Sequence, residues 1–338
     1  MLKLSRSQKR QRFIENNGII NPGITQLPCD ASFRHYYRIE KPDGSNIMLM
    51  DAPPDKEDSR PYIRVAMHLA SMGLSAPKIL SGDEENGFLL IEDFGNDTYT
   101  QLLNRGISEI KLYETAIDVL IRLHLHPRAT DIDIPHYNLD SLLEEAVILP
   151  DWFWPEIKYS ACPPEIREKF LIAWKTVFIN LDETPQSLVL RDYHVDNLML
   201  LQDRNGIASC GLLDFQDALI GPCAYDLVSL LEDARRDVSA DLTTIMLERY
   251  FNGIGDLDRD VFEEWYAVLG AQRHTKVAGI FSRLFRRDGK SVYLKHIPRV
   301  LKLLNHHLDV PGLSPVREWF DRYLPEYMES LSFVFDNK

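Results

Sequence analysis

The sequence predicts an α+β fold with two lobes, a small antiparallel sheet followed by a larger and mainly helical lobe. Three observations support this prediction. The chain has 338 residues, more than one hydrophobic core usually serves. Its N-terminal part contains short β-like runs around one helical segment, and from about Tyr99 onward the apolar residues recur with helical periodicity. We expect residues 1–95 to form the first lobe and residues 96–338 the second, with the boundary near Gly95 to Thr98.

The first lobe is expected to contain four strands and one helix. Runs rich in aromatic, apolar and β-branched residues predict the strands, and Asp43-Gly44 is a hairpin turn signal between the second and third of them. Residues 62–73 show the apolar spacing of a helix. The expected strands are residues 25–28, 33–40, 46–54 and 87–95.

The second lobe is expected to be helical apart from one β-like insert. The insert begins with a strand at residues 187–190 and a polar loop at residues 191–197. A strand at residues 198–201, a turn at Asn205-Gly206 and a strand at residues 208–215 complete it. The expected helices are residues 98–106, 109–126, 225–236, 241–251, 263–285, 298–308 and 317–331.

Composition argues against several classes of function. The formal charge of −13 disfavours general binding to nucleic acids or anionic membranes, because neutralising phosphates requires clustered Lys and Arg. No stretch has the length and apolar character of a membrane span or signal peptide. The four cysteines, Cys29, Cys162, Cys210 and Cys223, lack metal-site spacing, so we expect reduced thiols. These observations predict a cytoplasmic protein with no obligatory protein partner.

The loop at residues 191–197, RDYHVDN, carries the first chemical signal. Asp192 and Asn197 stand five positions apart, like the Asp and Asn of the protein-kinase catalytic loop H-R-D-x-x-x-x-N. In such a loop the Asp receives the proton of the attacking hydroxyl and the Asn binds a divalent ion. We expect Asp192 to be the catalytic base and Asn197 a Mg²⁺ ligand. Taken singly, such residues are more often turn or capping residues.

Asp214 completes the set. It follows a strand that a hairpin joins to the loop at residues 191–197, so the hairpin is expected to bring Asp214 and Asn197 to one metal cluster. Carboxylate and amide oxygens are suitable ligands for Mg²⁺. In this order and between apolar strands, the residues predict ATP-dependent phosphoryl transfer in a protein-kinase-like two-lobed fold.

Neighbouring polar residues receive smaller roles. Asp196 is expected to support loop structure, and Asp217 to have a lesser metal-binding or structural role. His194 is assigned no catalytic role. Asp226, in the first turn of the helix after Gly221-Pro222, is placed to hydrogen-bond backbone amides or the catalytic loop.

Two segments are predicted to contact ATP. The turn between the first two strands lacks a glycine-rich loop, but its backbone amides, a hydroxyl and an arginine can contact phosphates. A plain hairpin is the alternative interpretation. The second segment follows the last strand and fits a lobe hinge, whose backbone groups pair with the adenine edge. It spells Asp-Phe-Gly but precedes the catalytic loop, so it is not the metal site. The predicted nucleotide-contacting residues are Ser32, Phe33, Arg34, Glu92, Asp93 and Phe94.

The segments RDYHVDN, LLDFQDA and GPCAYDLVSLL resemble the aminoglycoside phosphotransferase superfamily, and the likeness extends over nearly the whole chain. Within it, CDASFRHYYR, IMLMDAPP, LLIEDFG and YLKHIPRVLKLL look most like the bacterial anomeric N-acetylmuramate/N-acetylglucosamine kinases. The resemblance implies transfer of the ATP γ-phosphate to the anomeric hydroxyl of an amino sugar, giving a sugar 1-phosphate for cell-wall recycling. Asp192, Asn197 and Asp214 match the superfamily's base and metal ligands.

The sequence departs from that pattern in three places. Leu190 stands where the superfamily usually has His. The third strand lacks the expected Lys, and the helix from residue 62 lacks its Glu partner. Because the Lys and its Glu partner are both absent, neither is left as an unpaired buried charge. This fits a site that binds phosphate another way, and Arg34 is the candidate replacement. The same absence leaves a second hypothesis open, that the protein is a noncatalytic nucleotide-binding pseudokinase.

The acceptor is less constrained than the reaction. A kinase for an aminoglycoside or a choline-like alcohol is an alternative, because Trp152, Trp154 and Trp265 suit a cation, although such aromatics are more often core. A protein kinase is disfavoured because residues 218–221 leave no room for an activation segment. A carboxylate on the sugar needs a basic partner, although a helical charge run is more often solvated surface. The candidate partners are Arg273, His274, Lys276, Arg283, Arg286 and Arg287.

Overall fold

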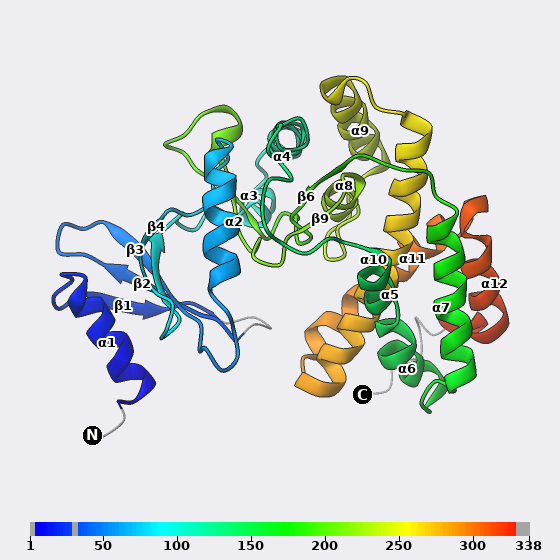
Figure 1. The fold of residues 1–338 in the computed structure, drawn as a ribbon, viewed down its shortest axis with the longest axis horizontal. Coiled ribbons are helices and arrows are strands. Elements are labelled where there is room, and N and C mark those ends of the chain that lie inside the picture. Colours follow the sequence, from blue (N-terminus) through cyan, green and yellow to red (C-terminus); the bar gives the residue numbers. More distant parts are fainter. Residues whose placement is uncertain (1–3, 29–32, 329–338) are drawn as a thin grey trace. The chain divides into compact units, whose positions relative to one another are not determined.

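The computed structural model describes residues 4–28 and 33–328 (Figure 1). The chain divides into two compact units, one of Met1–Val119 with Val195–Ala218 and one of Leu120–His194 with Leu219–Lys338. The chain therefore crosses between the units three times. The predicted lobe boundary after residue 95 stays a prediction, since these units are defined by contacts alone.

The first unit contains a five-stranded antiparallel sheet with the strand order β1-β2-β3-β5-β4. Four of its strands match the sequence prediction, and the hairpin between the second and third turns at Gly44, whose φ is 80°. The fifth, β4, was not predicted. The strands are β1 (Gly23–Gln26), β2 (His35–Glu40), β3 (Asn46–Asp51), β4 (Ile79–Asp83) and β5 (Phe88–Glu92).

Side chains alternate between the two faces of this sheet. One face packs against α1 (Arg6–Asn16), an unpredicted helix whose Phe13 and Ile14 join a buried cluster with Ile39, Leu49 and Phe88. The opposite face carries the intervening residues of the same strands. A capping box at Ser5 and Gln8 fixes the start of α1.

Asp51, at the end of β3, anchors the same helix. Its carboxylate is buried and accepts hydrogen bonds from Arg6 at 2.8 Å and Arg10 at 3.3 Å. Arg6 also lies 3.9 Å over the ring of Phe88. This buried ion pair fixes α1 to the sheet.

The rest of the first unit consists of three helices and a short hairpin. The hairpin pairs β7 (Leu198–Leu200) with β8 (Cys210–Leu212), and its connection contains a short 3₁₀ helix (Gly206–Ser209). This hairpin was predicted. The helices are α2 (Arg60–Ser71), α3 (Tyr99–Asn104) and α4 (Glu109–His124), the last of which runs on into the second unit.

The second unit is built around α10 (Arg259–Asp288), which packs against α5, α8, α11 and the π-helical turn at Leu149–Phe153. Its middle is buried on all sides. Gly279 allows this packing, because a Cβ there would lie 2.6 Å from the backbone of Ile148. The other helices are α5 (Leu139–Ala146), α6 (Trp154–Lys158), α7 (Pro164–Ile179), α8 (Ala224–Leu231), α9 (Ala240–Ile254), α11 (Ile297–His307) and α12 (Ser314–Tyr323).

The predicted insert is split between the two units. Its first strand, β6 (Gln186–Val189), pairs with β9 (Leu219–Pro222), an unpredicted strand, in the second unit. The sequence analysis assigned no partner to this first strand and did not anticipate that the insert divides between the units. The last predicted helix was also too long, since α12 ends at Tyr323 and a short 3₁₀ turn follows at Pro325–Tyr327.

Two predictions from composition can be compared with these residues. Cys162, Cys210 and Cys223 are free thiols, as predicted, and Cys29 lies outside the described residues. Among residues 4–28 and 33–328, no helix combines the length and apolar character needed to cross a membrane.

Candidate active site

A pocket of about 460 Å³ lies within the first unit, a volume typical of small-molecule sites. It uses the sheet face opposite α1, where Tyr36, Arg38, Met48 and Ile91 alternate with the residues buried under that helix. The β7–β8 hairpin forms part of its wall through Met199. A largely apolar slot with a few polar groups along its wall suits a flat ring carrying charged substituents.

The hairpin brings Asn197 and Asp214 to this pocket. Leu198 pairs with Leu212, and the Leu213 amide donates to the Asn197 carbonyl at 3.0 Å, so the residues that flank the hairpin lie together. Both Asn197 and Asp214 line the pocket. The prediction that a hairpin would place them at one site is confirmed as geometry, while metal binding there remains a prediction.

Asp214 has an unusual backbone conformation for its residue type. Its φ is 57°, in the left-handed region that non-glycine residues seldom occupy. Gln216 donates to its carboxylate at 2.8 Å, and the Asp214 side chain is 45% exposed. Gln216 therefore holds one carboxylate oxygen of Asp214, while the side chain still reaches solvent.

Arg34 points to the same carboxylate. Its guanidinium lies 3.7 Å from Asp214, and both residues line the pocket. A cation of fixed charge beside a carboxylate is well placed to exchange that partner for phosphate oxygens. Of the other residues predicted in this turn, Phe33 is exposed and stacks with Lys56 rather than lining the pocket, and Ser32 lies outside the described residues.

The predicted hinge residues also line the pocket, but their side chains have structural partners. Asp93 binds Arg38 at 2.9 Å and accepts from the Gly95 amide at 2.8 Å. Glu92 pairs with Arg204, whose guanidinium lies over the ring of Phe94. The strand ends at Glu92, so Asp93 and Phe94 lie just beyond it.

The strand and the helix on which the absent Lys and Glu pair was expected present uncharged residues to the pocket. Met48 of β3 lines the pocket, and so does Tyr62 of α2, whose ring lies 5.0 Å from that of Phe215. Burial raises the pKa of the Tyr62 hydroxyl, so this group is neutral. The pocket wall is therefore complete without that ion pair.

The loop that carries Asp192 belongs to the second unit, and Asp226 of α8 holds its backbone. The Asp226 carboxylate accepts from the amides of Leu190 at 2.7 Å and Arg191 at 2.9 Å. The Arg191 carbonyl accepts from Ser229 at 3.1 Å. These bonds fix Arg191 at a φ of 68°, another strained non-glycine position. The predicted supporting role of Asp226 is confirmed.

Basic residues surround Asp192, which is partly exposed. Burial acts to raise the pKa of its carboxyl, but Arg273, Lys276, His194 and Arg191 lower it below its usual value. Asp192 is therefore ionised at neutral pH. A carboxylate in this state accepts protons and cannot donate one.

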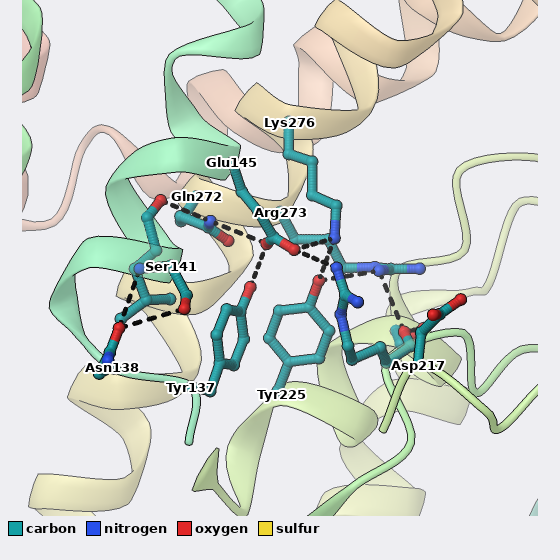
Figure 2. A network of polar contacts seen from close by, with 12 residues as sticks. Tyr137, Asn138, Ser141, Glu145, Asp217, Tyr225, Gln272, Arg273 and Lys276 are labelled. Carbon is teal, nitrogen blue, oxygen red and sulfur yellow. Dashed lines mark hydrogen bonds and ion pairs between the residues drawn. The ribbon is translucent and has the colours of Figure 1, made fainter. Parts of the chain in front are cut away.

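A polar network centred on Glu145 fixes these cations in place (Figure 2). Lys276 donates to Glu145 at 2.8 Å, and Tyr137 and Arg191 also bond to its carboxylate. Burial acts to raise the pKa of Glu145, but Lys276 and Arg191 lower it to about 2. Tyr225 accepts from both Arg273, at 3.2 Å, and Lys276, at 3.3 Å.

This network corrects one interpretation from the sequence. Arg273, His274 and Lys276 do not form a solvated helical face, because each is less than 10% exposed. Arg286 and Arg287 do lie at the surface, where they pair with Glu156 and Asp288. No local pattern pointed to Glu145, because its partner Lys276 lies 131 residues further along the chain.

A second group of metal-type ligands lies elsewhere in the second unit. Glu232, after α8, accepts from His274 of α10 and His307 of α11, each at 2.7 Å. These separations are hydrogen-bond lengths, and the cluster joins three helices. We assign it a structural role.

Comparison with known proteins adds to this geometry. Residues 23–265 match the model of the Phosphotransferase enzyme family. An N-acetylmuramate/N-acetylglucosamine kinase of Caulobacter vibrioides is 33% identical over 96% of this chain and 98% of its own. A protein of the same name from Pseudomonas aeruginosa is 38% identical over 81% of this chain and 80% of its own.

Solved structures support the fold. A choline/ethanolamine kinase family protein from Mesorhizobium loti superposes with a TM-score of 0.63 over 93% of this chain and 100% of its own, at 11% identity. At that identity the likeness concerns the fold alone. The family model covers well over half of the chain and the Caulobacter vibrioides kinase matches 96% of it, so the chain belongs to the Phosphotransferase enzyme family.

Proposed function

We propose that this protein transfers the γ-phosphate of ATP to the anomeric hydroxyl of N-acetylmuramate or N-acetylglucosamine, giving the sugar 1-phosphate for cell-wall recycling. The observation that carries the proposal is the β7–β8 hairpin, which sets Asn197 and Asp214 into the wall of one pocket. The names of the relatives supply the acceptor.

The pocket of the first unit is the proposed ATP site. Met48, Ile91, Met199 and Leu213 offer apolar surface for the adenine ring, and Arg34 provides charge for the phosphates. The oxygen ligands of Asn197 and Asp214 fit Mg²⁺, which prefers carboxylate and carbonyl oxygens. Bound Mg²⁺ would neutralise charge on the phosphates during transfer.

Asp192 is the proposed base. Its lowered pKa keeps it ionised, so it can orient the acceptor hydroxyl and take its proton as the phosphoryl group is transferred. Asp226 and Ser229 hold the loop backbone and thereby limit the rotation of the base.

The test is ATP consumption in the presence of Mg²⁺ with N-acetylmuramate, N-acetylglucosamine, choline and an aminoglycoside as acceptors. We expect turnover on the two amino sugars and a product phosphorus resonance typical of a sugar 1-phosphate. Turnover on choline or the aminoglycoside alone would contradict the amino-sugar acceptor but would still support ATP-dependent phosphoryl transfer.

Asp192→Asn tests the base directly. We expect kcat to fall about 10²- to 10⁴-fold, the usual contribution of general base catalysis. ATP binding by calorimetry should be unchanged, because every pocket residue lies in the other unit. Asp203→Asn, at an exposed position, is the matched control. ATP binding without turnover in the wild type would instead indicate a pseudokinase.

A further inference from the structure

The segment that follows α8, residues 232–236, lies beside the catalytic loop in the second unit. The Arg235 guanidinium is 3.5 Å from the Nε2 atom of His194, two residues after Asp192. His194 is buried and interacts electrostatically with both Asp192 and Arg235. Arg235 therefore contacts a side chain, His194, that in turn interacts with the proposed base.

Arg235 differs from the other cations near Asp192 in its accessibility. Arg273 and Lys276 are buried and bound to Tyr225, and Lys276 also neutralises Glu145. Arg235 is partly exposed. A ligand that reaches Asp192 can reach this guanidinium without breaking the network around Glu145.

The surroundings of Arg235 hold it in place. The guanidinium lies 5.8 Å from the centre of the buried ring of Phe281. His296 lies against the same ring, with the ring centres 5.9 Å apart. Burial, Lys295, Arg235 and Arg299 lower the pKa of His296, and Asp233 opposes them.

A buried acceptor lies in the same segment. Asp233 is 2% exposed, and its Oδ1 atom accepts from the Arg235 amide at 2.7 Å. Asp233 thereby fixes the backbone from which the Arg235 side chain extends.

We propose that Arg235 holds the lactyl carboxylate of N-acetylmuramate. This inference rests on the proposed function and identifies what recognises the acidic sugar. In N-acetylmuramate the lactyl ether sits on C3, two ring positions from the anomeric carbon. Its carboxylate therefore lies on a short side arm near the reacting oxygen, and Arg235 contacts His194, which interacts with Asp192.

The test compares two sugars on the same enzyme. N-acetylglucosamine lacks the lactyl group, so it reports on everything except the carboxylate contact. For Arg235→Gln we expect the ratio of kcat/KM values, N-acetylmuramate over N-acetylglucosamine, to fall about 10- to 100-fold, the range for a lost charge-assisted hydrogen bond. Arg235→Lys should give an intermediate ratio, because it keeps the charge but loses the fork geometry.

A neutral probe gives a second readout. The methyl ester of N-acetylmuramate removes the charge and adds only one methyl group, so the wild type should prefer the acid more strongly than Arg235→Gln does. Arg236→Gln, which removes the adjacent arginine, is the matched control and should keep the wild-type ratio.

The outcomes separate the two proposals. If the wild type phosphorylates both sugars and Arg235→Gln leaves their ratio unchanged, the carboxylate subsite is refuted and the kinase assignment stands. An equal loss on both sugars also refutes it, since that result describes a general structural role. If the wild type phosphorylates neither sugar, the proposed function fails and this inference fails with it.

Discussion

At the scale of single residues, Asp192 is the proposed base, and Asn197 and Asp214 are the proposed metal ligands. The spacing of Asp192 and Asn197 is a local pattern, and it can be identified without knowing the fold. The cations that tune the base were not predictable, because Arg273 and Lys276 come from a helix far along the chain. Even the burial of those cations contradicted the usual behaviour of a helical charge run.

Arg34 is the residue whose role most needs a test. Since it lies 3.7 Å from Asp214 in the pocket, we expect Arg34→Ala to raise the KM for ATP about 10- to 100-fold through loss of a charged phosphate contact. Arg34→Lys should restore part of the affinity. Arg64→Ala, at an exposed position of α2, is the control. An unchanged KM in Arg34→Ala would assign phosphate binding to other groups.

The pH dependence of kcat/KM tests the environment of Asp192. Arg273 is the strongest of the charges that lower its pKa, so Arg273→Gln should raise that pKa and move the acidic limb of the profile to higher pH. Activity is then lost sooner as the pH falls, because a protonated Asp192 cannot act as base. Arg273→Lys should keep the limb near its original position. A limb that stays in place in a folded Arg273→Gln variant contradicts this account.

At the scale of helices and strands, the elements that sequence patterns missed share a weak apolar signal. The α1 segment RSQKRQRFIEN buries only Phe13 and Ile14, so its helical periodicity is faint. Gly82 and the polar residues of β4 hide its alternation, and β9 ends in Gly221-Pro222, which indicates a turn. Tertiary pairing, rather than local preference, decides these segments.

The hydrogen bonds from the backbone of Leu190 and Arg191 to Asp226 of α8 give a prediction at the scale of helices and strands. Asp226→Asn replaces one acceptor oxygen with an N–H₂ group facing a backbone N–H, so we expect a loss of about 1–3 kcal/mol in the free energy of unfolding and a clear fall in kcat. ATP affinity should not change. Denaturant unfolding and steady-state kinetics measure both effects, with Asp241→Asn in α9 as an exposed control. A variant that keeps wild-type kcat contradicts a positioning role for Asp226.

At the scale of the whole molecule, the fold class was predictable because the change from β-like to helical periodicity is a long-range trend. The division into compact units was not. Residues 195–218 follow the catalytic loop in sequence but pack with the N-terminal sheet, and only tertiary contacts show that. The proposed ATP pocket needs this segment, since Asn197, Met199 and Asp214 all come from it.

The reactivity of the buried cysteines can measure local unfolding separately in each unit. Cys210 lies in β8 of the first unit and Cys223 at the start of α8 in the second, and both thiols are buried. A thiol reagent attacks such groups only when the surrounding structure opens, so its rate measures local unfolding. Cys162 is partly exposed and should react first.

Mass spectrometry of labelled peptides, in a Cys29→Ser background, can follow these sites separately. We expect Mg²⁺ and ATP to slow labelling of Cys210 at least several-fold, because the nucleotide would contact the hairpin that carries it, and to slow Cys223 less. Equal protection of both thiols would mean that the two units open together. The three free cysteines thus provide, without any added probe, a record of which half of the molecule a ligand stabilises.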